Sequence, residues 1–86
     1  MNFPFKQTKT NDKVFREFSS GVDDEDLKWH YDMEDRTVVP MNENDWMFQR
    51  DNCLPEKLDK EIFIKAGEWH RVIKGKTELL IEVIFN

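Results

Sequence analysis

The chain contains two histidines, and each directly follows a tryptophan, as Trp29-His30 and as Trp69-His70. Imidazole nitrogens are common metal ligands, yet a histidine on a strand is often satisfied by a neighbouring backbone carbonyl. Asp32 stands two residues after His30. Because side chains alternate between the two faces of a strand, we expect His30 and Asp32 to point together while Trp29 points away. A metal or ligand site and ordinary packing both remain open.

Short apolar segments separated by turn residues follow one another from Leu27 onward, a pattern typical of an all-β barrel or sandwich. The last segment, 78–86, is apolar on both faces, which predicts a central strand. Pro40 marks an edge, bend or strand end, because proline cannot donate to a ladder. The other predicted strands are LKWHYD (27–32), RTVVPM (36–41), WMFQR (46–50), CLPEKL (53–58), EIFI (61–64) and EWHRVI (68–73).

The length of 86 residues predicts one small domain with a thin core, to which seven Phe, three Trp and one Tyr contribute large buried areas. Residues 1–26 mix phenylalanine patches with the acidic run Asp23–Asp26. We expect 1–26 to form an N-terminal arm and acidic loop, and 27–86 to form the barrel domain.

The net charge of −5 argues against direct nucleic-acid binding through a basic surface, although an acidic interaction protein or DNA mimic stays an alternative. The single cysteine, Cys53, excludes an intrachain disulfide and a thiolate zinc cluster, which favours a reducing compartment. We find no apolar run suited to a signal peptide or membrane span. The expected location is the cytoplasm, either of the protein's own cell or of a host.

The segment DKEIFIKAGEWHRVIKG (59–75) resembles the second motif of the cupin family, which reads glycine, five residues, proline, one residue, glycine, two residues, histidine. Gly67 and His70 match the second glycine and the histidine of that motif. Asp59 replaces the first glycine, and Lys65 replaces the proline. The resemblance implies a small cupin-like barrel over 27–86.

The first cupin motif begins with His-x-His, followed after four residues by Glu. Here His30 and Asp32 take the two histidine positions, Thr37 the glutamate position, and Asn44 the later turn glycine. The chain also resembles small, mostly uncharacterised cupin-like proteins, some encoded by bacterial viruses, that carry WHxDxxDR and WHRxIKG. No established activity follows from that resemblance.

The resemblance implies that His30, Asp32 and His70 form a two-histidine, one-carboxylate set. Such a set suits iron, manganese or zinc and leaves coordination positions open for water or substrate. The competing hypothesis is that hydrogen bonds and an ion pair satisfy these side chains without a metal.

Two further groups of residues are candidates for binding. Arg36, Arg71 and Lys74 could gather into a cationic cluster for a carboxylate or phosphate, or instead pair with nearby acidic residues. Trp29 and Trp69 could contact a ligand, fill the core, or lie in the interface of a homodimer, which we expect for so thin a domain.

Three hypotheses for the function follow. The first is a small cupin-like binding module that holds a small anionic ligand or a host protein at the barrel mouth. The second is a metal-dependent enzyme that uses His30, Asp32 and His70. The third is an acidic interaction protein whose acidic loop binds a basic surface, with salt-dependent association.

Overall fold

The computed structural model describes residues 4–85, and its regular secondary structure is almost entirely β, as the sequence predicts. Residues 1–3 of the predicted arm and Asn86 of the last predicted strand lie outside the described residues. The elements are β1 (Lys6–Lys9), β2 (Val14–Phe18), the short 3-10 helix η1 (Asp24–Asp26), β3 (Arg36–Pro40), β4 (Met47–Arg50), β5 (Glu56–Lys57), β6 (Ile62–Ile64), β7 (His70–Ile73) and β8 (Leu79–Phe85).

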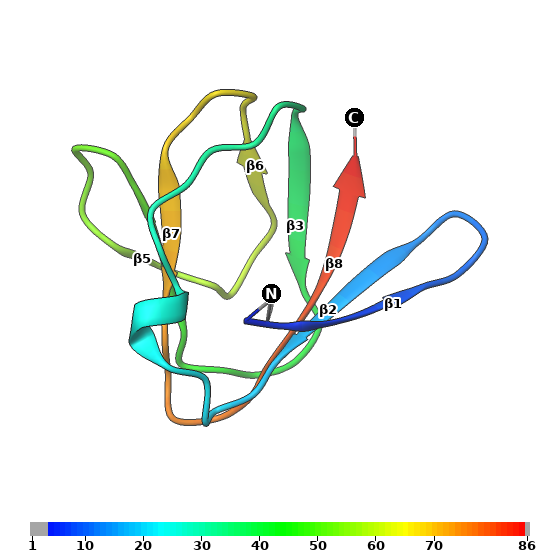
Figure 1. Ribbon diagram of the computed structural model, residues 1–86, viewed down its shortest axis with the longest axis horizontal. Coiled ribbons are helices and arrows are strands. Elements are labelled where there is room, and N and C mark those ends of the chain that lie inside the picture. Colours follow the sequence, from blue (N-terminus) through cyan, green and yellow to red (C-terminus); the bar gives the residue numbers. More distant parts are fainter. Residues whose placement is uncertain (1–3, 86) are drawn as a thin grey trace.

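Two antiparallel sheets enclose the interior of the barrel. The larger sheet has the order β1–β2–β8–β3–β6, and the smaller one has the order β5–β4–β7. Figure 1 shows β2, β3 and β8 on one side of the interior and β7 on the other. The prediction that the last strand is central is confirmed, because β8 pairs with β2 on one edge and with β3 on the other.

The core lies between the sheets and follows from the alternation of side chains along each strand. The buried residues of β8 are Leu79, Ile81 and Val83. On the same inner face of the sheet, they lie beside the buried Val14 and Phe18 of the neighbouring strand β2. The N-terminal hairpin therefore shares its core with the barrel, while the division of the chain at residue 26 stays a prediction. The other buried apolar residues are Leu27, Val38, Trp46, Phe48, Leu58, Ile62 and Ile64.

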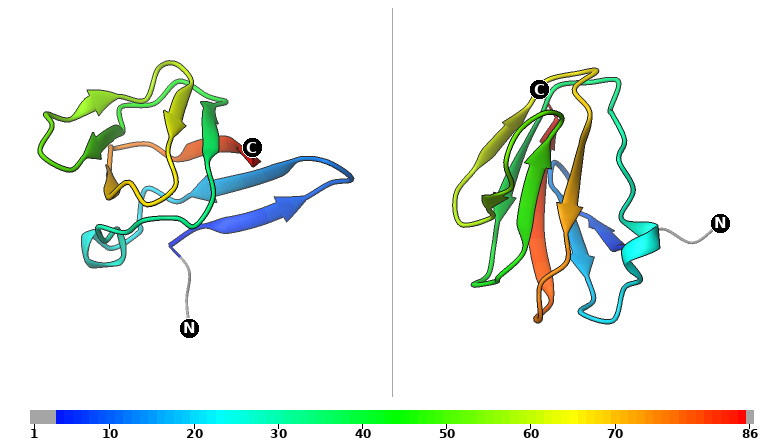
Figure 2. Two further views of the ribbon diagram at one scale, coloured as in Figure 1. Left: turned by 90° about the horizontal axis from the view of Figure 1, so that it is seen from above. Right: turned by 90° about the vertical axis from the view of Figure 1, so that its left-hand side faces the viewer.

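The predicted strand at 27–32 is wrong. Residues 27–35 form no strand and touch β7 through a single bridge, in which His30 and His70 exchange two backbone hydrogen bonds of 3.0 and 2.9 Å. The ladder stops there because the Asp32 carbonyl instead accepts a hydrogen bond from Gly67, in the turn before β7. In both views of Figure 2 this segment runs from η1 to β3 as irregular chain.

Pro40 ends β3, as its missing N–H predicts. The predicted strand at 53–58 is reduced to the two residues of β5. Within the described residues, no helix has the length and apolar character needed to cross a membrane.

Candidate metal centre

Three side chains meet at one end of the interior: His30, Asp32 and His70. One potential ligand atom from each lies within 4.8 Å of the other two. The bridge to β7 brings His30 beside His70, and their rings meet edge to face with centroids 4.4 Å apart. The structure thus brings together the set implied by the family resemblance, from an irregular segment and from the first residue of β7.

A turn at 65–68 fixes the segment that carries Asp32. Gly67 has a φ of +80°, a backbone conformation in which glycine lacks the Cβ strain of other residues, and its N–H donates to the Asp32 carbonyl at 2.8 Å. The N–H of Ala66 donates to the Asp35 carboxylate, also at 2.8 Å. The glycine that matches the cupin motif therefore holds a candidate ligand in place through the backbone.

A neighbouring backbone carbonyl shows which ring nitrogen of each histidine carries the hydrogen. His30 Nδ1 lies 3.0 Å from the Lys28 carbonyl, and His70 Nδ1 lies 2.7 Å from the Glu68 carbonyl. A carbonyl oxygen only accepts, so each Nδ1 carries the hydrogen and donates it. In the neutral ring the other nitrogen, Nε2, then has a lone pair available for a metal, as in many histidine sites with such outer partners.

Asp32 lies between the two Nε2 atoms. Its Oδ2 is 3.4 Å from His70 Nε2, and its Oδ1 is 4.0 Å from His30 Nε2. His70 is 4% exposed, and burial lowers the pKa of its imidazole, more than the Glu68 hydrogen bond raises it. When the His70 ring is neutral, its Nε2 is an acceptor 3.4 Å from the Asp32 carboxylate, and a cation placed between the two would bind both.

A divalent metal fits this donor set. Two imidazole nitrogens and one carboxylate oxygen suit iron, manganese or zinc, and three protein ligands leave coordination positions open. His70 is buried, Asp32 is largely buried, and the His30 side chain is 55% exposed, so the group lies at the border between interior and solvent. A bound ion would be reachable from both sides.

The family resemblance puts Thr37 at the position of the usual glutamate ligand, but the side chain of β3 that lies beside the centre is Arg36. On β3, Arg36 and Val38 face the interior, while Thr37 lies on the opposite face, in register with Phe63 and Ile84. Arg36 Nε lies 3.4 Å from Asp32 Oδ2. That separation gives a strong charge interaction, but the Nε–H is buried without a hydrogen-bond partner.

A cavity of about 460 Å³ opens from the centre into the barrel. His30, Asp32 and His70 line its polar end together with Arg16 and Arg36, and most of the remaining wall is apolar. Arg16 was not singled out from the sequence. The signal was present in β2, where Val14, Arg16 and Phe18 share a face and place one arginine between two buried apolar residues.

Arg71 and Lys74 lie elsewhere. Arg71 donates to the Gln49 side chain at 3.0 Å and stacks on Trp29, and Lys74 donates to the Val22 carbonyl at 2.9 Å. No contact within residues 4–85 joins either side chain to Arg36.

Trp29 and Trp69 are 38% and 47% exposed and lie outside the cavity, as strand alternation predicts when the histidines face inward. They line a shallow groove with Asp51, and Trp69 meets Tyr31 edge to face at 4.9 Å. Trp46, by contrast, is buried in the core. The homodimer expected through the exposed pair stays a prediction.

Comparisons with known proteins support the cupin-like fold. A cupin domain from Bordetella pertussis Tohama I superposes with a TM-score of 0.61 at 20% sequence identity, covering 100% of this chain and 98% of that one. A protein from Neisseria meningitidis superposes with a TM-score of 0.61 at 8% identity, covering 100% and 88%. No family model and no curated protein matches the sequence. At these identities the likeness shows the fold alone.

Proposed function

We propose that this protein binds a divalent metal ion through His30, Asp32 and His70 and accepts a small organic molecule in the adjoining cavity. A bound ion would have coordination positions left for an oxygen of that molecule. This proposal combines the first hypothesis from the sequence, a small binding module, with the metal site of the second.

One observation carries the proposal. Both histidines use Nδ1 to donate to backbone carbonyls, so in the neutral rings both Nε2 atoms are acceptors, 4.0 and 3.4 Å from the carboxylate oxygens of Asp32. Three converging acceptors repel one another unless a cation lies among them. Arg36 supplies one positive charge to Asp32 but donates no hydrogen bond through its buried Nε.

The roles of the residues follow from their positions. His70 is the buried ligand, held by Glu68, whose carboxylate accepts a hydrogen bond of 2.7 Å from Arg50. His30 is the exposed ligand, and it also lines the cavity. A bound divalent ion would supply Lewis acidity toward an oxygen of the molecule in the cavity.

Elemental analysis of tag-free protein, purified without chelator, tests the proposal, together with a titration of chelator-treated protein with Mn²⁺ followed by electron paramagnetic resonance. We expect about one ion per chain. His30→Ala and His70→Ala should each weaken Mn²⁺ binding more than about a hundredfold, since even outer partners of metal ligands contribute about ten- to a hundredfold.

A matched pair of carboxylate variants sharpens the test. Asp32→Asn should lose the ion, whereas Glu34→Gln, which removes a carboxylate two residues away and outside the ligand group, should bind as the wild type does. A folded wild-type protein that rejects manganese, iron and zinc would contradict the metal site.

A further inference from the structure

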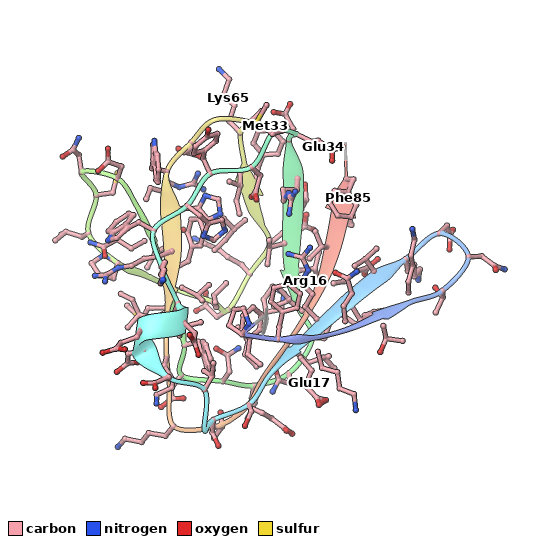
Figure 3. The ribbon with its side chains drawn as sticks, viewed as in Figure 1. Arg16, Glu17, Met33, Glu34, Lys65 and Phe85 are labelled. Carbon is pink, nitrogen blue, oxygen red and sulfur yellow. The ribbon has the colours of Figure 1, made fainter. Side chains whose placement is uncertain are left out.

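The wall of the cavity holds two arginines on two different strands of one sheet. Arg16 of β2 is paired with Ile81 of β8, and Arg36 of β3 is paired with Phe85 of the same strand. Both arginine side chains therefore project from the inner face of the sheet into the interior. Figure 3 shows Arg16 and Glu17 leaving β2 toward opposite sides, with Phe85 at the end of β8. Both arginines line the cavity.

The two guanidinium groups are only partly satisfied. Arg16 uses Nε to donate to Gln7 at 2.9 Å and lies over the ring of Phe5, but no hydrogen bond of its terminal nitrogens is present within residues 4–85. Arg36 is 14% exposed and lies over the ring of Phe85, and its Nε–H has no hydrogen-bond partner. Stacking on aromatic rings keeps each guanidinium plane in position while its edge remains available for an acceptor.

The electrostatics of the pair favour a bound anion. Burial lowers the pKa of Arg16, and the nearby charge of Arg36 lowers it further, against a smaller opposing effect of Asp32. Two like charges on a largely apolar wall are unfavourable unless an anion joins them. The carboxylates that line the cavity are Asp26, which is exposed, and Asp32, which lies beside Arg36, so the two arginines share one largely buried counter-charge.

We propose that the cavity binds a small monocarboxylate with an apolar body, whose carboxylate is held by Arg16 and Arg36 while the body packs against the apolar wall. Guanidinium groups match a carboxylate in bidentate geometry. Apolar residues of both sheets, among them Phe18, Val38 and Phe48, surround the remaining volume. The inference rests on the proposed role of the cavity as a ligand site, but not on the metal.

The test compares two probes of nearly equal shape. Benzoate carries the carboxylate on an aromatic body, and benzamide replaces it with a neutral group. A dry cavity of about 150 Å³ already holds benzene, so the volume of about 460 Å³ is sufficient for either probe. Calorimetric titrations are run on chelator-treated protein and on protein with saturating Mn²⁺, and Mn²⁺ binding is measured separately by electron paramagnetic resonance.

We expect benzoate to bind about ten- to a hundredfold more tightly than benzamide, because charge-assisted hydrogen bonds are the stronger ones. Arg16→Met and Arg36→Met should each remove most of that preference. Lys13→Met is the charge-matched control, since this exposed lysine lies in the β1–β2 turn away from the cavity, and it should bind benzoate as the wild type does.

The inference would be overturned if the two probes bound equally well, or if the preference for benzoate survived in both arginine variants. Neither result depends on whether the protein binds the metal. Protein that binds Mn²⁺ but not benzoate would overturn the carboxylate site and leave the metal site standing. Protein that binds benzoate through both arginines but rejects Mn²⁺ would support the inference and contradict the proposed metal site.

Discussion

The contribution of the ion pair between Asp32 and Arg36 to the stability of the protein can be measured by substituting each partner. The side chains are 13% and 14% exposed, and Oδ2 lies 3.4 Å from Nε. At this separation two unit charges attract by about 5 kcal/mol in an effective dielectric of about 20, before desolvation is subtracted. Removing one member of a fully buried pair costs about 3–5 kcal/mol, because the other charge is left without a partner.

Because both side chains keep some exposure, we expect Asp32→Asn and Arg36→Met each to lower the free energy of unfolding by about 2–3 kcal/mol in metal-free protein. The double variant should lose less than the sum of the two, with a coupling energy of about 2 kcal/mol. Urea unfolding in the presence of chelator, followed by tryptophan fluorescence and circular dichroism, measures all four corners of the cycle.

Glu56→Gln is the control for this cycle. Its carboxylate is 39% exposed and lies 3.8 Å from Arg50, so its removal should cost less than about 1 kcal/mol. Losses below about 1 kcal/mol for both single variants, with an additive double variant, would refute the reasoning that Arg36 balances a buried Asp32 charge.

Two predictions concern the frame around the site. Trp46→Phe should lower the free energy of unfolding by about 2 kcal/mol in urea, because it leaves a void at a 1% exposed position and removes the donor to the Thr77 carbonyl at 2.7 Å. The Lys76 backbone N–H, which donates to Asp45 at 2.8 Å, lowers the pKa of that carboxyl below its ordinary 3.8. A lowered folded-state pKa contributes stability above the ordinary value, and this is lost as the pH falls through the folded value. Urea midpoints from pH 5 to about 2 should therefore fall less steeply in Asp45→Asn than in the wild type; equal slopes would contradict this assignment.

The all-β fold was predictable because the pattern is local. Alternating apolar residues separated by turns placed the strands now seen as β3, β4, β6, β7 and β8. The two apolar faces of the last segment predicted its central place in the larger sheet.

The family resemblance implied the grouping of His30, Asp32 and His70 that the structure shows, but the local structure that carries His30 and Asp32 was not predicted. The alternation that placed His30 with Asp32 and His70 with Val72 does agree with the structure. The strand predicted for 27–32 fails because β7 pairs with β4 on one edge and keeps only one bridge on the other. Which partner takes a strand edge is decided by distant residues, and periodicity alone carries no such information.

By itself, the sequence determined the β-class and most of the strands, since these depend on local alternation. The family resemblance, and not the alternation, implied that His30, Asp32 and His70 come together. The tertiary structure alone decided that Arg36 and Arg16, rather than Arg71 and Lys74, share the wall of the cavity. The physical reason is that β2 and β3 flank β8 and turn their inner faces to one interior, a pairing that joins residues far apart in the chain.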